Sequence, residues 1–151
     1  LKQSQQELQN IIAELRPVAL QDTGLATALR QFGAQWQELN NIRCDVTVHH
    51  ERPLPLEMEE SLYRITQEAL ANVSRHSRAR SVSVTLGYGA NAVQLTIKDD
   101  GNGFDTAQTH NGFGISAMHH RVGQLHGTLK LASAVDRGTT IMIEVPLGEQ
   151  P

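Results

Sequence analysis

Three polar residues on one predicted helix could do chemistry together. Glu68, Asn72 and His76 are spaced four apart, so they form one line along a helix of 3.6 residues per turn. The line drifts toward the apolar face of the helix, where an unpaired polar group would cost about 1–3 kcal/mol. An asparagine bonded to a neighbouring loop and a histidine at a frayed helix end would also explain the pattern.

A carboxylate followed by two glycines is the second candidate site. Asp99 ends a predicted strand, and Gly101 and Gly103 follow it. Glycine permits positive φ and lets the backbone approach a ligand closely, and successive N–H groups in such a loop can bind an anion. The pattern D-x-G-x-G also occurs in ordinary turns, so alone it leaves both interpretations open.

Two more glycine motifs follow. Gly112 and Gly114 precede a predicted helix that begins at Ile115, and the free N–H groups of a helix N-terminus bind phosphates. Gly138 and Thr139 precede the last predicted strand, where a simple hairpin loop is the alternative. The chain contains neither the G-x-G-x-x-G dinucleotide fingerprint after a strand nor a P-loop.

The elements that must position these residues follow from hydrophobic periodicity. Helical spacing predicts helices over residues 1–15, 23–39, 56–76 and 115–125, the second of them capped by Asp22 or Thr23. Alternation predicts strands over 43–49, 82–86, 93–97, 129–133 and 141–147. Strands with one apolar face indicate an α+β fold: a two-layer sandwich of a mostly antiparallel mixed sheet covered on one face by helices.

The first helix differs from the others. Leu1, Leu8 and Leu15 repeat every seven residues, which is typical of a bundle or coiled-coil seam, although a simple amphipathic helix fits as well. Pro17 ends or kinks this helix. We therefore divide the chain into residues 1–17, the end of a bundle helix and its joint, and residues 18–151, a globular domain.

Composition excludes several classes. The 151 residues are 39% apolar and 19% charged, which suits one globular domain. A net charge of −3 gives no broad basic surface, so nucleic acid is not expected as a partner. The single cysteine, Cys44, cannot form an internal disulfide and fits a reducing compartment. No run approaches the ~20 apolar residues of a membrane span.

Together, the four motifs in this order resemble the ATP-binding domain shared by DNA gyrase, Hsp90, histidine kinases and the mismatch-repair MutL proteins, over about residues 40–147. Two further blocks are similar to sensor histidine kinases of the nitrate/nitrite group, whose partners are response regulators with LuxR-type DNA-binding domains. These blocks are Leu15-Arg16-Pro17 with Gly24-Leu25, and the run from Gln67 to Ser77.

The resemblance implies ATP and Mg²⁺ as cofactors. It implies that Asn72 gives an oxygen to Mg²⁺ and that Glu68, one turn earlier, orients a metal-bound water or polarises the transfer. Arg75 and His76 would meet phosphate or ribose. Thr139 would lie close to the adenine.

The remaining implied roles concern the base and a mobile lid. Asp99 would accept a hydrogen bond from the adenine amino group, while Gly101 and Gly103 would let the chain pass against the base. Gly112 and Gly114 would end a short lid, and the helix that they open would face the phosphates.

By resemblance, residues 18–151 are the catalytic domain of a histidine protein kinase. The resemblance implies that the catalytic domain is cytoplasmic and donates the γ-phosphate of ATP to a histidine on a separate dimerisation domain. The dimerisation domain would make the full protein a homodimer. A response regulator would then receive the phosphoryl group. Any membrane anchor would lie in upstream segments. The phosphoacceptor histidine with its acidic neighbour has no match among the seven histidines here. A nucleotide-binding regulatory module that transfers nothing and an anti-sigma-type serine kinase are the alternatives.

Overall fold

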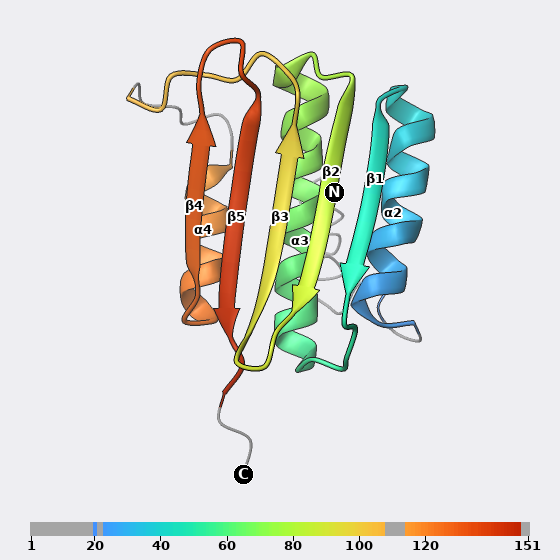
Figure 1. Cartoon of the computed structure of the whole chain (residues 1–151), viewed down its shortest axis with the longest axis vertical. Helices are drawn as coiled ribbons and strands as arrows, with labels where there is room; N and C mark the ends of the chain where they lie inside the picture. The colour runs from blue at the N-terminus through green and yellow to red at the C-terminus, as the bar shows by residue number, and fades with distance from the viewer. Residues whose placement is uncertain (1–19, 21–22, 108–113, 149–151) are drawn as a thin grey trace, which may run out of the picture.

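The computed structural model describes residue 20 and residues 23–107 and 114–148, which form two layers. One five-stranded sheet is covered by three α-helices that all lie behind it in Figure 1. The predicted two-layer α+β sandwich is confirmed. The elements are α2 (Gly24–Asn40), β1 (Arg43–His49), α3 (Leu56–Asn72), η2 (Val73–Ser77), β2 (Ser81–Tyr88), β3 (Ala92–Asp99), α4 (Ile115–Gln124), β4 (Thr128–Ser133) and β5 (Thr139–Pro146).

The strand order is β1-β2-β3-β5-β4. Only the β1–β2 pair is parallel, and the other three pairs are antiparallel, so the sheet is mixed and mostly antiparallel as predicted. The register places Asp99 beside Val82 on one side and beside Thr139 on the other. The two residues predicted to contact the base therefore lie at the same end of adjacent strands.

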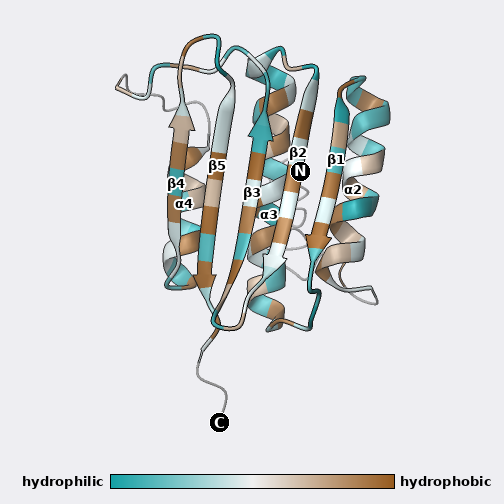
Figure 2. Cartoon of the chain, viewed as in Figure 1, coloured by the Kyte–Doolittle hydropathy of each residue, from teal (hydrophilic) through white to brown (hydrophobic). Residues whose placement is uncertain are grey.

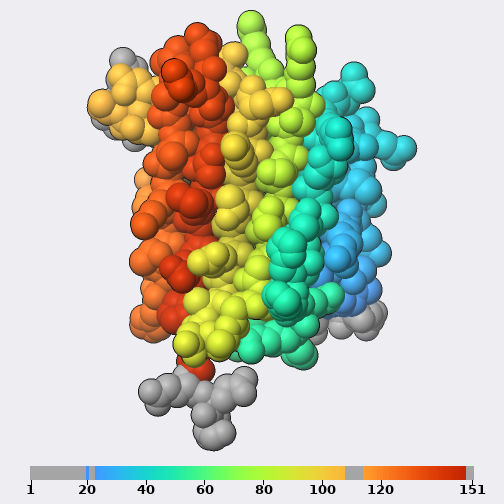
Figure 3. Space-filling view, in the orientation of Figure 1, coloured from blue at the N-terminus to red at the C-terminus, as the bar shows by residue number. Residues whose placement is uncertain are grey.

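Alternation along the strands accounts for the two layers. In β2 and β3, every second residue is buried against the helices, and the hydropathy colouring of Figure 2 shows the same alternation. The opposite face carries mainly hydroxyl, amide and charged side chains, among them Thr47, Ser83, Thr96, Lys98 and Glu144. Figure 3 looks onto this uncovered face, across which all five strands lie side by side.

The start of α2 differs from the sequence prediction. Thr23 occupies the N-cap position but makes no side-chain capping bond. Instead, the carboxylate of Glu59 on α3 accepts a hydrogen bond from the backbone N–H of Leu25 at 2.9 Å. A free N–H at a helix N-terminus binds a carboxylate well, so a neighbouring helix supplies the cap. Asp22 and the predicted helix over residues 1–15 lie outside the described residues.

The third predicted helix changes its geometry before it ends. It is α-helical over Leu56–Asn72, and its predicted inner face is buried: Met58, Leu62, Ile65, Ala69 and Val73. The continuation over Val73–Ser77, predicted as ordinary helix to about residue 76, is instead a π-helical turn. Such wide turns are rare and occur frequently at functional sites. Arg78 then takes a left-handed conformation with φ 52° and directs the chain into β2.

Candidate functional site

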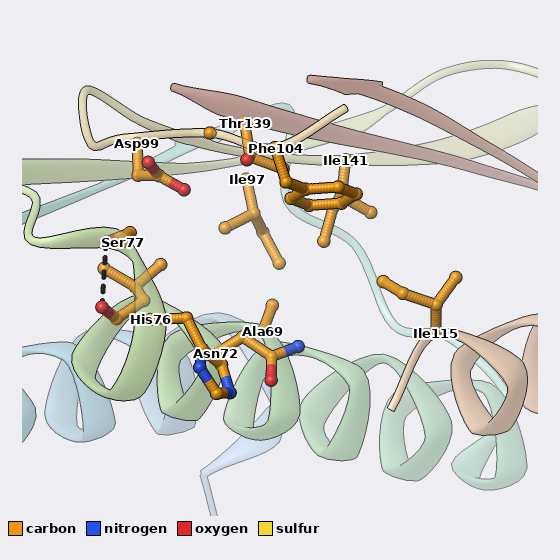
Figure 4. A pocket seen from close by; sticks show the side chains of 12 residues that line it. Ala69, Asn72, His76, Ser77, Ile97, Asp99, Phe104, Ile115, Thr139 and Ile141 are labelled. Carbon is orange, nitrogen blue, oxygen red and sulfur yellow. Dashed lines mark hydrogen bonds between the residues drawn. The ribbon is translucent and has the colours of Figure 1, made fainter. Parts of the chain in front are cut away.

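A pocket lies between the sheet and the helical layer, at the end of β3 and the start of β5. The end of α3, the π-turn and the start of α4 form its other wall. Figure 4 shows these side chains facing one another across the hollow. The lining residues are Ala69, Asn72, Val73, His76, Ser77, Ile97, Asp99, Gly103, Phe104, Ile115, Thr139 and Ile141.

Among the described residues that line the pocket, Asp99 is the only acidic one, and 7% of its surface is exposed. One carboxylate oxygen, Oδ1, accepts the N–H of Gly101 at 2.8 Å. Burial raises the pKa of Asp99 above its usual value of 3.8, although backbone hydrogen bonds from Gly101 and Thr139 oppose the shift. A buried carboxylate that keeps its charge attracts a hydrogen-bond donor in the pocket.

Asp100, the next residue, is exposed and has a different task. Its Oδ1 accepts the backbone N–H groups of Arg80 and Ser81 at 2.8 and 3.0 Å, and its Oδ2 accepts the Ser81 hydroxyl at 2.9 Å. These hydrogen bonds, with that from Ser81 the strongest influence, lower the pKa of Asp100. The two adjacent carboxylates therefore have different partners. Asp99 faces the pocket, and Asp100 connects the end of β3 to the start of β2 through hydrogen bonds.

Glycines let three backbone segments meet behind Asp99. A Cβ at Gly101 would overlap the carbonyl oxygen of Ser77, and a Cβ at Gly138, where φ is +73°, would overlap the carbonyl oxygen of Asp99. A Cβ at Gly103 would overlap the carbonyl oxygen of Ala134. Glycine is thus required at these positions because protein backbone approaches them, before any ligand is considered.

Asn72 and His76 form the helical wall with Ser77. Asn72 is the last residue of α3, and the π-turn follows it directly, so Asn72, His76 and Ser77 all line one pocket. Ser77 is buried, donates its hydroxyl proton to the carbonyl of Val73 at 2.8 Å and accepts the N–H of Ala79 at 3.1 Å. These bonds hold the wide turn closed at its end.

The structure brings five of the predicted site residues together in the pocket: Asn72, His76, Asp99, Gly103 and Thr139. Gly101 lies immediately behind it, where its N–H holds Asp99. Arg75 is exposed on the π-turn and is not part of the lining. Gly112 lies outside the described residues.

Glu68 lies in a neighbouring hollow, which is also lined by Arg64, Gln67 and Arg121. Its carboxylate nevertheless reaches the start of α4. Gly114 caps α4 with φ 64°, and a Cβ there would come within 2.5 Å of Oε1 of Glu68. The negative charge of Glu68 therefore sits where the helix dipole of α4 favours an anion.

The sequence prediction missed the apolar lining, the lining residue Ser77 and, beside the pocket, Ser133. Phe104 comes from a segment without apolar periodicity, and Ile115 was predicted as the first residue of a helix but not as pocket lining. Ile97 and Ile141 were predicted as strand residues but not as pocket lining. Ser133, at the end of β4, was missed although it follows an alternating strand: its Oγ lies 2.8 Å from Oγ1 of Thr139.

The fit of Mg²⁺ to this pocket depends on how many protein ligands the ion needs. Mg²⁺ prefers oxygen ligands and usually keeps several waters, taking only one or two groups from the protein. Among the described residues, no three His, Cys, Asp or Glu side chains cluster as a metal cage. A single amide oxygen from Asn72, on the pocket wall, fits this type of coordination.

None of the described helices is long and apolar enough to cross a bilayer.

Comparisons with known proteins identify the family of this chain. Residues 57–149 match the family described as histidine kinase-, DNA gyrase B-, and HSP90-like ATPase. Because this match covers more than half of the chain, the chain belongs to that family of ATP-binding domains, and the predicted family is confirmed.

Individual relatives point to one branch of the family. The chain is 34% identical over 149 residues to the signal transduction histidine-protein kinase/phosphatase DegS of Brevibacillus brevis, covering 97% of this chain and 39% of the relative. It is 31% identical over 144 residues to the oxygen sensor histidine kinase NreB of Staphylococcus carnosus, covering 93% and 42%. The chain therefore spans about two fifths of the length of these relatives.

A solved structure has the same fold. The blue-light activated histidine kinase of Erythrobacter litoralis EL346 superimposes with a TM-score of 0.68 at 20% identity, covering 82% of this chain and 42% of the other. At this identity the likeness supports the fold only. Together with the family match, it places the pocket on an established ATP-binding fold.

Proposed function

We propose that this chain is the ATP-binding catalytic domain of a two-component sensor histidine kinase. In this role it donates the γ-phosphate of Mg-ATP to a histidine on a separate dimerisation domain, and a response regulator then receives the phosphoryl group. The observation that carries the proposal is the meeting of Asp99, Thr139 and Asn72 on the walls of one pocket. Both relatives are named as histidine kinases, which supports the choice of branch.

The base end of the pocket is the sheet side. There the Asp99 carboxylate accepts a hydrogen bond from the adenine amino group, and Thr139 lies beside it in the ladder. Apolar side chains of Ile97, Phe104 and Ile141 cover the faces of the ring. A small number of polar groups on an otherwise apolar wall is typical of a small-molecule site.

The phosphate end is the helical side. Asn72 would hold Mg²⁺, which would supply charge neutralisation for the transferring phosphoryl group. His76 and Arg75 lie on the π-turn that follows Asn72 and would contact phosphate or ribose. Glu68, whose carboxylate lies beside Gly114, would orient a water or polarise the transfer.

The chemistry is a transfer of one phosphoryl group. The bond between the γ-phosphorus and the β–γ bridging oxygen breaks, a bond from phosphorus to an imidazole nitrogen forms, and ADP leaves. Such transfer depends mainly on positioning and on charge neutralisation, so the domain needs no nucleophile of its own. The acceptor histidine comes from the dimerisation domain, to which residues 1–17 belong, and that domain makes the full protein a homodimer.

The test is to incubate the full-length protein with γ-labelled ATP and to examine the chemical stability of the label. Label that is lost in acid and retained in base identifies phosphohistidine and supports the proposal. Acid-stable label identifies a serine kinase, and absence of label in a protein that binds ATP identifies a regulatory module. Residues 1–151 alone should bind ATP without becoming labelled.

A further inference from the structure

Ser133 makes an unusual number of contacts for one hydroxyl group. It is the last residue of β4 and pairs with Thr139 in the ladder with β5. Its Oγ accepts the N–H of Phe104 at 2.9 Å, donates to the carbonyl of Gly138 at 3.1 Å and lies 2.8 Å from Oγ1 of Thr139. Two of these partners, Phe104 and Thr139, line the pocket.

The number of protons decides how these contacts work. A serine hydroxyl has one proton and can accept two further bonds. The carbonyl of Gly138 can only accept, so it takes the Ser133 proton. The proton between Ser133 and Thr139 must then come from Thr139. The Thr139 hydroxyl can therefore accept a hydrogen bond from a group in the pocket but has no proton left to donate to it.

The adjacent Asp99 is also an acceptor. Asp99 and Thr139 are partners in the β3–β5 ladder, and both line the pocket. A ligand atom that faces both must therefore donate, and an amino group carries two protons for this purpose. A carbonyl oxygen at the same place would meet only lone pairs, and buried polar groups without a partner are costly.

We propose that Ser133 is a positioning residue that fixes the Thr139 hydroxyl as an acceptor and so makes the site select 6-amino purines over 6-oxo purines. This inference deepens the proposed function and rests on it. Ser133 acts through Thr139 and does not itself touch the base. Because Ser133 also holds the N–H of Phe104, a purely structural role would affect every nucleotide equally.

The test compares three nucleoside triphosphates that differ at position 6 of the purine: ATP with an amino group, inosine triphosphate with a carbonyl and a proton on the neighbouring N1, and purine riboside triphosphate with hydrogen. Binding is measured for the wild-type chain and for Ser133→Ala. We expect Ser133→Ala to lower the affinity for ATP by about two- to tenfold, which corresponds to the net contribution of one hydrogen bond. Purine riboside triphosphate should bind as before, and the preference for ATP over inosine triphosphate should fall.

Two controls make the result specific. Ser83→Ala removes a hydroxyl from the uncovered face of β2, outside the pocket, and should leave all three affinities unchanged. Ser133→Thr retains the hydroxyl and should restore the preference for ATP. In a Thr139→Val background, adding Ser133→Ala should no longer change that preference, because the hydroxyl that it orients is gone.

The outcomes separate the two proposals. If folded Ser133→Ala keeps the wild-type ratio of affinities for ATP and inosine triphosphate, or weakens all three nucleotides equally, the positioning role is wrong while ATP binding stands. If Ser133→Ala does not fold, an unchanged preference in Thr139→Val has the same meaning. If the wild-type chain does not bind ATP, the proposed function itself fails.

Discussion

Asp99 and Thr139 are direct partners in the antiparallel ladder between β3 and β5, one at the end of its strand and the other at the start. The ladder fixes the distance between their backbones, so the two side chains reach the pocket from adjacent positions on one wall. Neither depends on a flexible loop for its place. This pairing places both side chains of the pocket wall on regular strands of the sheet.

We expect Asp99→Asn to lower the affinity for ATP by about tenfold or more, because hydrogen bonds to charged groups contribute about 1.5–3 kcal/mol. The amide presents a donor as well as an acceptor, so the preference for ATP over GTP should also fall. Nucleotide titration monitored by calorimetry measures both effects. Asp45→Asn, at an exposed carboxylate on β1, serves as the matched control. Equal wild-type affinity for ATP and GTP would count against the role of Asp99.

Asn72→Ala tests the metal ligand. The variant should lose the part of the ATP affinity that depends on Mg²⁺, while affinity measured with a chelator present should change little. Circular dichroism should show an intact fold, because the residue contributes no large apolar group to the core. Gln94→Ala, on the uncovered sheet face, is the control for a lost amide. If the ATP affinity of the variant depends on Mg²⁺ as it does in the wild type, Asn72 is not a metal ligand.

The pH dependence of stability tests the burial of Asp99. Its pKa is raised in the folded chain, so the folded state binds this proton more tightly than the unfolded state. The resulting stabilisation is present below the unfolded pKa and is lost as pH rises through the folded value. Asp99→Asn cannot titrate. The urea midpoint of the variant relative to wild type should therefore rise as the pH increases from about 4 to about 6, and a constant difference would contradict the raised pKa.

Gly138→Ala tests the close approach behind the pocket. The added Cβ would overlap the Asp99 carbonyl, and φ of +73° is itself unfavourable for alanine, so we expect a loss of about 2 kcal/mol or more in unfolding free energy. Gly123→Ala is the matched control, since it lies inside α4 with open space around it. That change should stabilise the chain by up to about 1 kcal/mol. Similar denaturant midpoints for the two variants would refute the packing argument.

The sequence predicted the sheet more completely than it predicted the helices. Alternation in β2, β3 and β5 predicted the buried face, and the D-x-G-x-G and Gly-Thr motifs marked two strand ends that the ladder places side by side. Periodicity cannot reveal which helix caps another, so the Glu59 cap of α2 was missed. Nor does it distinguish an α-helical turn from the π-helical turn over Val73–Ser77.

The lining also shows why a site is harder to predict than a fold. Ser133 acts through three hydrogen bonds to residues that are distant in the sequence or lie across a turn, and a single serine at a strand end carries no pattern. Glu68 shows that spacing along a helix does not place a side chain. Glu68 and Asn72 are one turn apart, yet the Glu68 carboxylate lies at the start of α4 and lines the next hollow.

The strand order has a consequence for biosynthesis. β5 follows β4 in the chain but inserts between β3 and β4, so the hydrogen-bonding edge of β3 stays unsatisfied until residues 139–146 have left the ribosome. An unpaired edge next to an apolar face is a template for aggregation. A chain that ends before Thr139 would thus lack one wall of the pocket and expose an unpaired edge of the central strand β3.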